Sequence, residues 1–333
     1  MGLPVHDLVS VLETAYDFEE PEDSAYLAKV ASAVDRYLDP HGRHTTCATW
    51  TFDATDAANV VVDHTSIVRG DPGFLKLMAE VQSSFDTAAV EHSYRGKHGI
   101  TLALDMLSPV PHVRAVAAEK YAEVGLSDVV GFMASDPSRR GLIITWGAKD
   151  PSRPFQRGEV RRWDRIAAHI AAGHRLRRSR FEEGEAVLTP SGRVEHAEGP
   201  ATTRAARAAL REAAVAVDRA RGRMRRDDPD RSLDLWRGLV SGRWSIVDRF
   251  DSDGRRYLVA RRNDPTMPDP RALSLRERQV VGFAALGHSN KLIAYELGLA
   301  ETTVATNLAR AMRKLGVRNR VELAALAWSM SSK

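Results

Sequence analysis

The spacing of apolar residues divides the chain into segments with different expected structure. Over residues 1–178, stretches with a helical period alternate with stretches rich in β-branched and aromatic residues, which is typical of a mixed α/β domain. Helices are expected at 8–16, 24–38, 72–85 and 154–180. Strands are expected at 45–52, 59–68, 129–134 and 141–146.

Residues 179–262 show a second, smaller α/β pattern. Two strand-like stretches separated by a tight turn span 186–197, and a hairpin-like stretch spans 244–261. An Ala- and Arg-rich helix is expected between them, at about 201–225. Three prolines then occur within six residues. Because proline restricts both itself and the residue before it, we expect 263–272 to be an extended and rather stiff linker.

The last segment, 273–333, contains two short helical patterns joined by a turn that includes Gly298. Gly298 can take the positive φ that reverses the chain without steric cost. Ala294 is small where the first helix must approach the second, and Val304 is the apolar residue that ties the second helix to the core. This spacing is that of a helix-turn-helix, which places its second helix in the major groove of DNA.

Four runs of sequence in this segment carry a resemblance to a known family. They are L-x-x-R-E-R-x-V at 273–280, S-N-K-x-I-A at 289–294, T-V at 303–304 and K-L-G-V-x-x-R at 314–320. The segment resembles the C-terminal DNA-binding domain of LuxR/NarL/FixJ-type bacterial transcription regulators. That resemblance implies an all-α domain of four helices, at about 274–286, 290–297, 301–315 and 319–330.

Local chemistry supports these helix boundaries independently of the resemblance. Ser274 with Glu277, and Asn319 with Glu322, have the spacing of a capping box. Three of the helices are each followed by a glycine, where a left-handed terminal residue is favoured: Gly287, Gly298 and Gly316.

The resemblance also assigns DNA contacts, with departures from the usual pattern. Ala300 stands where the family usually has a capping Ser or Thr, and alanines replace two basic residues that usually face the groove. Base reading is therefore expected from Ala305, Thr306, Asn307, Ala309 and Arg310, the alanines by contact with thymine methyl groups. Phosphate contacts, which position the domain without specifying sequence, are expected from Asn290, Lys291, Thr302, Thr303, Lys314 and Arg320.

In this family the fourth helix often forms a dimer contact. The corresponding apolar residues here are Val321, Leu323, Ala324 and Ala327. We therefore expect a homodimer on an inverted-repeat DNA site, whose symmetry mirrors that of the protein.

The distribution of charge favours the same partner. Residues 271–333 contain ten Lys and Arg and four Glu, a net charge of +6. The whole chain carries +4, so residues 1–270 carry −2. A basic module on a slightly acidic body is the expected layout for binding double-stranded DNA. Residues 204–231 contain nine arginines and five acidic residues. This composition indicates a solvated helix or, alternatively, a further contact with DNA or RNA polymerase.

The region upstream of the linker is expected to be a sensory region. The run 131–173 is similar to the end of a GAF-type sensory domain, in which two antiparallel strands lead through a loop into a helix. A PAS-like or other α/β sensor is the competing fold, and 179–262 resembles a PAS-like fragment. Four aromatic residues on expected strands could line a ligand pocket or belong to the core: Trp50, Phe52, Phe132 and Trp146.

Several classes of function find no support in the sequence. No apolar run is long enough to span a membrane, and the first residues do not have the pattern of a signal peptide, so a cytoplasmic protein is expected. His41, His44 and Cys47 offer three metal ligands, whereas a structural zinc site normally needs four, so we expect no metal. No cofactor motif, catalytic constellation or phosphoacceptor receiver pattern is recognisable.

The sequence therefore predicts a multidomain one-component transcription regulator. A GAF-like α/β domain at 1–178 and a smaller PAS-like unit at 179–262 would sense a small molecule or a protein of unknown identity. The linker at 263–272 would join them to a LuxR-type DNA-binding domain at 273–333. The alternatives are a sigma-factor-like promoter-recognition subunit and a DNA-regulated enzyme.

Overall fold

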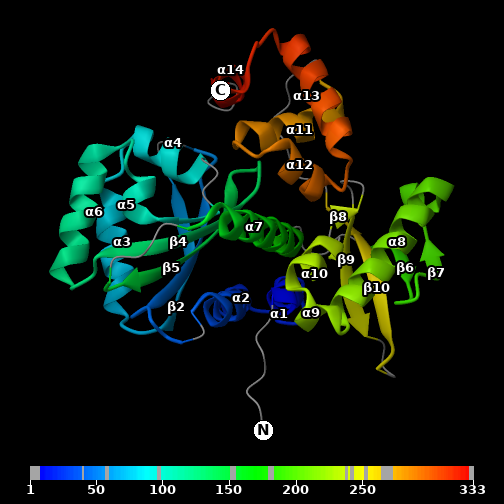
Figure 1. The fold of residues 1–333 in the computed structure, drawn as a ribbon, viewed down its shortest axis with the longest axis horizontal. Coiled ribbons are helices and arrows are strands. Elements are labelled where there is room, and N and C mark those ends of the chain that lie inside the picture. Colours follow the sequence, from blue (N-terminus) through cyan, green and yellow to red (C-terminus); the bar gives the residue numbers. More distant parts are fainter. Residues whose placement is uncertain are drawn as a thin grey trace.

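Two antiparallel sheets and a helical domain surround a long helix, α7 (Arg157–Arg178), in a computed structural model of the chain (Figure 1). The first sheet lies on one side of α7, the second sheet on the other, and the helical domain above both. The described residues are 8–39, 41–56, 60–95, 99–150, 155–178, 184–236, 239–240, 244–250, 254–263 and 273–329.

The first sheet has the strand order β2-β1-β5-β4-β3, and every neighbouring pair is antiparallel. Its central strand is almost entirely buried, whereas the edge strand β2 is largely exposed. The strands are β1 (Cys47–Asp53), β2 (Val61–Arg69), β3 (Ile100–Leu102), β4 (Asp128–Ser135) and β5 (Arg140–Ala148).

Helices cover both faces of this sheet. Because side chains alternate between the faces of a strand, Trp50 and Ile143 point to one face and Ile144 and Trp146 to the other. The face of Trp50 packs against α3 (Gly73–Ser83), α4 (Thr87–Arg95), α5 (Ala103–Met106) and α6 (Pro111–Glu123). The opposite face packs against α1 (Leu8–Ala15), α2 (Asp23–Leu38) and α7.

The second sheet has the strand order β7-β6-β10-β9-β8. Its strands are β6 (Gly184–Leu188), β7 (Val194–Ala197), β8 (Leu239–Val240), β9 (Trp244–Phe250) and β10 (Arg256–Arg262). The helical elements between β7 and β8 are the 3-10 helix η1 (Gly199–Thr202), α8 (Arg204–Arg221), α9 (Met224–Asp227) and α10 (Pro229–Leu235).

The two sheets share one hydrophobic core. Buried residues of α1, α2 and α7 form a continuous cluster with Leu210 of α8, Trp236 and Trp244 of β9. Ion pairs reinforce the junction: Arg221 lies 3.0 Å from Glu13, and Arg162 lies 2.7 Å from Asp230. The boundary expected near residue 178 therefore separates two sheets but not two cores.

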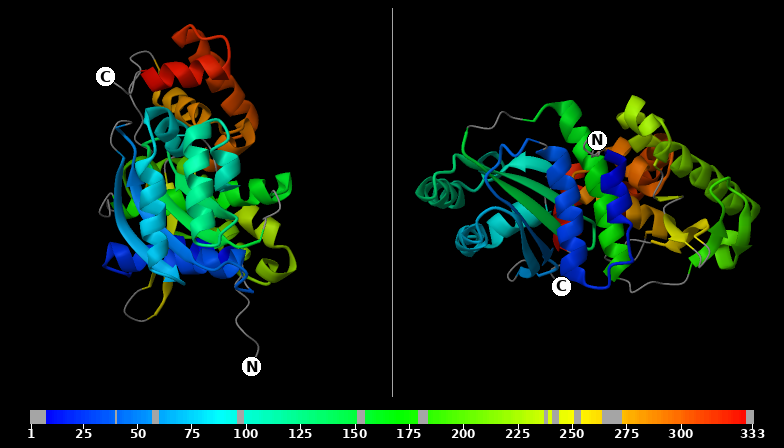
Figure 2. Two further views of the ribbon diagram at one scale, coloured as in Figure 1. Left: turned by 90° about the vertical axis from the view of Figure 1, so that its left-hand side faces the viewer. Right: turned by 90° about the horizontal axis from the view of Figure 1, so that it is seen from below.

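The helical domain at the C-terminal end has a core of its own. Its helices are α11 (Leu275–Ala285), α12 (Asn290–Leu297), α13 (Glu301–Leu315) and α14 (Arg320–Ser329). Val280, Phe283, Ile293, Val304 and Leu323 are among the residues of a cluster that contains no residue of the two sheets. The domain stands at one end of the molecule in both Figure 1 and the left view of Figure 2.

Most elements expected from the apolar spacing are confirmed. The four C-terminal helices begin and end within one residue of the expected bounds, and the expected strands and long helices of the upstream region are present. The segments α4, β3, α5, α6, α10 and β8 were not anticipated. Helix α6, for example, buries only a narrow stripe of Val113, Ala117 and Tyr121. Most of the Pro-rich linker, 264–272, lies outside the described residues.

Candidate functional site

The two helices α12 and α13 are joined by a tight turn whose geometry follows from its residues. Gly298 has φ 59°, in the left-handed region, and ends α12. The Ser289 side chain caps the start of α12 by accepting a hydrogen bond from the Leu292 N–H at 3.2 Å. Ala300 precedes α13 and provides no side-chain cap, as expected from the sequence. Of the two expected capping boxes, Ser274 and Glu277 form a complete one on α11. At α14 the Asn319 side chain accepts from the Glu322 N–H at 2.9 Å.

Helix α13 has one face in the core and one face in solvent. Val304, Leu308 and Ala311 are buried against the other helices of the domain. The opposite face carries Ala305, Thr306, Asn307, Ala309 and Arg310, of which all but the half-buried Asn307 are exposed. Thr306 Oγ1 donates to Thr302 O at 2.9 Å and Asn307 Nδ2 donates to Thr303 O at 2.8 Å, so both side chains lie along the helix surface. All five residues expected to read bases therefore share one accessible surface.

This helical arrangement agrees with a comparison of the sequence with known families. Residues 271–327 match the family described as bacterial regulatory proteins, luxR family. The C-terminal segment is a LuxR-type DNA-binding domain.

Curated relatives match a short part of the chain. The transcriptional regulatory protein UhpA of Escherichia coli (strain K12) is 48% identical over 67 residues, which cover 20% of this chain and 31% of UhpA. The HTH-type transcriptional regulator MalT of Vibrio campbellii is 36% identical over 92 residues, which cover 28% of this chain and 10% of MalT. These matched regions span less than a third of either relative, and the relatives are transcription regulators.

A solved structure of SdiA in complex with octanoyl-rac-glycerol aligns with 97% of this chain and 93% of its own, at 11% identity and a TM-score of 0.34. A TM-score this low does not establish a shared fold.

The residues expected to contact phosphates fall into two groups. Lys291, Thr302 and Thr303 are exposed. The others have partners inside the LuxR-type domain: Arg320 donates to His288 O at 2.6 Å and to Asn290 Oδ1, and Lys314 Nζ donates to Glu277 Oε2 at 2.6 Å. The hydrogen bond from Lys314 lowers the pKa of Glu277. The sequence shows that these positions are polar, but not that their side chains hold the domain together.

The α14 residues expected at a dimer contact also differ in exposure. Val321 is 79% exposed, and Ala324 and Ala327 are partly buried. Leu323, by contrast, is fully buried in the core of the LuxR-type domain. It therefore has no surface to offer to a partner, because the helical period places it on the inner side of α14.

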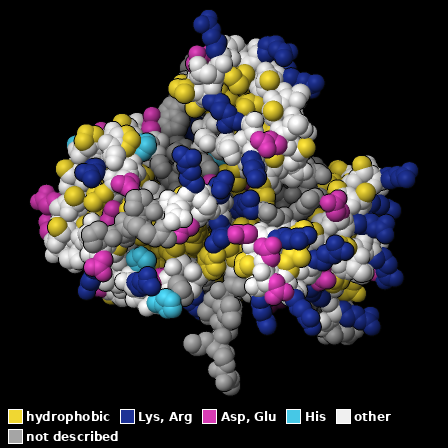
Figure 3. All heavy atoms as spheres, in the orientation of Figure 1, with side chains coloured by type: hydrophobic (Ala, Val, Ile, Leu, Met, Phe, Trp, Pro, Cys, Tyr) yellow, Lys and Arg dark blue, Asp and Glu magenta, His cyan; other side chains and the backbone are white. Residues whose placement is uncertain are grey.

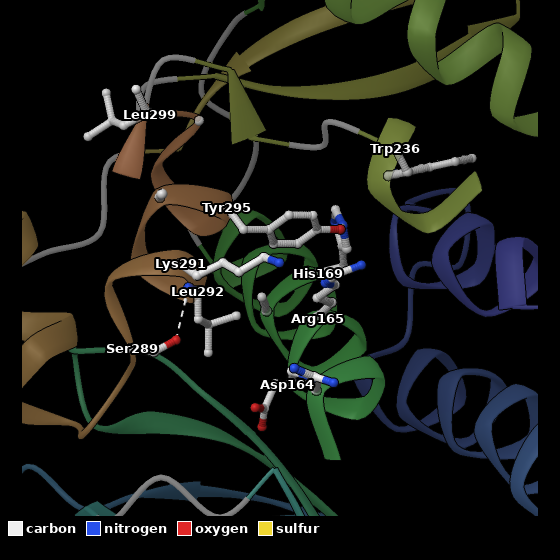
Figure 4. Close-up of a pocket in the computed structure, with 14 residues that line it drawn as sticks. Asp164, Arg165, His169, Trp236, Ser289, Lys291, Leu292, Tyr295 and Leu299 are labelled. Carbon is white, nitrogen blue, oxygen red and sulfur yellow. Dashed lines mark hydrogen bonds between the residues drawn. The ribbon is translucent and has the colours of Figure 1, made fainter. Parts of the chain in front are cut away.

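Helix α12 lies against α7 of the upstream region, with a cleft of about 590 Å³ beside the contact (Figure 4). The residues that line the cleft include Arg161 and Arg165 of α7, Lys291 of α12 and Ser289, which caps α12. Leu292 is only 8% exposed, although it is not part of the core cluster of the LuxR-type domain. Together with Ala167 and Ala168 of α7 it lines a smaller pocket, so α7 is the element that covers it.

A chain of hydrogen bonds runs through this α7–α12 interface. Tyr295 of α12 points toward His169 of α7, and its hydroxyl lies 2.7 Å from His169 Nε2 (Figure 4). The same hydroxyl donates to Leu233 O at 2.9 Å. On the far side of the imidazole, Nδ1 lies 3.1 Å from the hydroxyl of Tyr16. Arg165 lies over the Tyr295 ring, 5.5 Å from its centroid.

The donor of each of these hydrogen bonds can be assigned. A hydroxyl has one proton, and that of Tyr295 goes to Leu233 O, so His169 Nε2–H donates to Tyr295 and Nδ1 accepts from Tyr16. Burial, with a smaller contribution from Arg165, lowers the pKa of His169 to about 3. The imidazole is therefore neutral near pH 7, as this pattern requires.

A second cavity, of about 450 Å³, lies in the upstream region between the first sheet and helices α3 to α6. Of the aromatic residues expected in a pocket, Trp50 and Phe132 belong to its wall. The Phe132 ring nevertheless packs on the other side of the sheet, 5.2 Å from Trp163 of α7. Phe52 packs against Tyr94 at 5.0 Å, and Trp146 donates to Asp35 in the opposite core.

Most of the cavity wall was not anticipated from the sequence. It includes Met78 and Phe85 around α3, Tyr94 on α4, Met106 on α5 and Tyr121 on α6. Their spacing is that of any buried helix face, so no signal in the sequence separates a cavity wall from a packed core.

The segment with three candidate metal ligands is divided between two environments. Cys47 is buried in β1, and burial raises the pKa of its thiol. His44 lies 3.3 Å from Asp39, and His41 is exposed. Across the described part of the chain, no group of three His, Cys, Asp or Glu side chains is arranged to hold a metal ion. No helix among the described residues is long and apolar enough to cross a membrane.

Proposed function

We propose that this protein is a one-component transcription regulator that binds operator DNA through α13 and is controlled by its upstream α/β region. The observation that carries the proposal is the exposed polar face of α13, within a domain that matches a family of regulatory proteins. A helix presented in this way by a helix-turn-helix fits the major groove.

Base reading is assigned to the exposed face of α13. Thr306, Asn307 and Arg310 carry hydrogen-bonding groups, and Arg310 can bond to the O6 and N7 atoms of guanine. Ala305 and Ala309 leave room for thymine methyl groups on the same face.

Phosphate contacts are assigned first to Lys291, Thr302 and Thr303, which are exposed beside that face. Asn290, Lys314 and Arg320 are proposed to act at the same backbone while they join α13 to α11 and α14 to α12. Figure 3 shows Lys and Arg side chains over the LuxR-type domain and again over α8. The second group offers a further contact with DNA or RNA polymerase.

A homodimer is proposed through α14, with Val321, Ala324 and Ala327 at the contact. Support comes from Val321, a large apolar side chain that is exposed at the surface of the LuxR-type domain. Two such domains would meet the two halves of an inverted repeat.

Control is assigned to the α7–α12 interface. Lys291 faces α7 in the cleft beside Arg161 and Arg165, so a DNA backbone that approached Lys291 would meet α7. The arrangement described here is therefore proposed to be the state with low DNA affinity, and a signal would favour release of α12. A GAF-like identity for the first sheet is supported by β4 and β5, which pair antiparallel and precede α7 in the chain.

Genome-wide binding to source DNA tests the function, with the fragment 266–333, which has a core of its own and lacks α7, compared with the purified full-length chain, whose binding should be weaker. We expect discrete sites with inverted symmetry. Thr306→Ala should change the preferred base at a defined position, at a cost of about 1–3 kcal/mol for the original site. Lys291→Ala should weaken binding to all sequences and reduce the dependence on salt, because it removes one phosphate contact. Binding that is indifferent to both substitutions would contradict the proposal.

A further inference from the structure

The wall of the cavity between the first sheet and α3 to α6 is mainly apolar and uncharged. The cavity is lined by apolar and aromatic side chains, with hydroxyl groups and the Gln82 amide as its polar members. Among the described residues that line it, none carries a charge. Its volume of about 450 Å³ lies in the range of sites for drug-sized ligands.

One polar group in this wall lacks a partner. Ser93 of α4 is 3% exposed, and its hydroxyl makes no hydrogen bond to any described residue. A buried hydroxyl is normally hydrogen-bonded, because removing it from water without a replacement partner is unfavourable. Tyr94, the next residue, does have a partner, since its hydroxyl donates to Gln82 at 2.5 Å. The orphan hydroxyl therefore marks a position where a ligand atom would be stabilised.

We infer that this cavity binds a neutral, mainly apolar small molecule whose single hydrogen-bonding group meets Ser93. A carboxylate or phosphate does not fit, because burying an anion without a cation nearby is strongly unfavourable. An apolar body of the ligand would fill the space between Trp50, Met78 and Phe85.

The position of Met133 gives the site a route to the DNA-binding domain. Met133 of β4 belongs to the wall of the cavity and also lines the small pocket that contains Leu292 and Glu296 of α12. A ligand that displaces the flexible Met133 side chain would act directly on the α7–α12 interface. This regulatory step rests on the proposed function, whereas ligand binding itself does not.

The test uses two fluorescent probes with the same rings and different charge. N-phenyl-1-naphthylamine is neutral, and 1-anilinonaphthalene-8-sulfonate is its anionic counterpart. Titration of the full-length protein should show saturable binding of one neutral probe per chain, at least tenfold tighter than binding of the sulfonate. No saturable binding, or equal affinity for the two probes, would overturn the inference.

Two substitutions at Ser93 locate the probe. Ser93→Phe places an aromatic ring in the cavity and should weaken binding of the neutral probe at least tenfold. Ser93→Ala keeps the cavity open and should weaken it only severalfold, through loss of the hydroxyl. Full retention of affinity in Ser93→Phe would overturn the inference.

Hydrogen exchange of the wild-type protein covers the case in which Ser93→Phe does not fold. The neutral probe should slow exchange in α4 and β4, and protection confined to other elements would count against the site. No arm of the experiment contains DNA, so its outcome is separate from that of the proposed function.

Discussion

At the scale of single residues, the Tyr295 hydroxyl connects two parts of the molecule. It accepts from His169 Nε2–H and donates to Leu233 O, so α12 is tied to both α7 and α10. Sequence reasoning could not find this role. Tyr295 stands at an ordinary position on a short helix, and its partners are 126 and 62 residues away in the chain.

Tyr295→Phe should weaken the α7–α12 interface. The substitution keeps the ring but leaves the His169 N–H and the Leu233 carbonyl buried without a partner, at a cost of about 1–3 kcal/mol. We expect faster hydrogen exchange in α12 and tighter binding of DNA. Tyr257→Phe, on β10, is the matched control and should change neither. Unchanged exchange in α12, or faster exchange with weaker DNA binding, would refute the proposed control.

The neutral state of His169 predicts a dependence of stability on pH. Burial lowers the pKa of His169 to about 3 in the folded protein, below its ordinary value of about 6.5 in the unfolded chain. Between these values the unfolded chain binds more protons, so the free energy of unfolding rises with pH, by at most about 1.4 kcal/mol per pH unit. The contribution is fully present above pH 6.5 and is lost as the pH falls toward 3.

Urea unfolding at pH 7 and pH 5 measures this effect. Tyr16, Arg165 and Tyr295 are the titratable groups that face or influence the imidazole, and they keep their charge over this range. The loss of stability between the two pH values should be smaller in His169→Gln than in the wild type. Equal losses would show that His169 is not the group responsible.

At the scale of secondary-structure elements, the helices of the LuxR-type domain could be predicted closely and their surfaces could not. Side-chain caps mark where α11 and α12 begin, and glycines at left-handed positions mark where α11, α12 and α13 end. These signals are local, so the sequence contains them in full. Which side of α14 is buried depends on how it packs against α11, and this is why Leu323 was assigned to a dimer contact and lies in the core.

Val321→Glu tests the proposed dimer through α14. Because Val321 is 79% exposed, the fold should tolerate the change, with less than about 0.5 kcal/mol of effect on stability. Two glutamates brought together at a dimer contact should lower the dimer fraction in sedimentation equilibrium and weaken binding to a full inverted repeat. Leu275→Glu, at another exposed apolar position, is the control and should leave both unchanged. A dimer fraction that is the same in Val321→Glu and the wild type would place the contact elsewhere.

At the scale of the whole molecule, the proposed control of the DNA-binding domain by the cavity would pass through Met133. Met133 lies in the wall of the cavity and beside α12, while Met106 lines the cavity on α5 and is absent from the pockets beside α12. Coupling between two such sites typically amounts to about 1–3 kcal/mol.

DNA titrations with and without the neutral probe measure this coupling. Saturating probe should tighten DNA binding severalfold in the wild type and in Met106→Ala. Met133→Ala should still bind the probe, but its DNA affinity should no longer respond, because Met133 lines both the cavity and the small pocket beside α12 and its side chain is shortened. A response that survives in Met133→Ala would exclude this path.

The sequence by itself determined the elements whose signals are local. Helix caps, turn glycines and the alternation of apolar residues are properties of neighbouring residues, and they defined the helix-turn-helix and most strands and helices of both sheets. Only the tertiary structure decided the cavity, the shared core of the two sheets and the contact of α12 with α7. Each of these depends on residues far apart in the chain, such as Ser93 with Trp50 or His169 with Tyr295, whose proximity is set by packing.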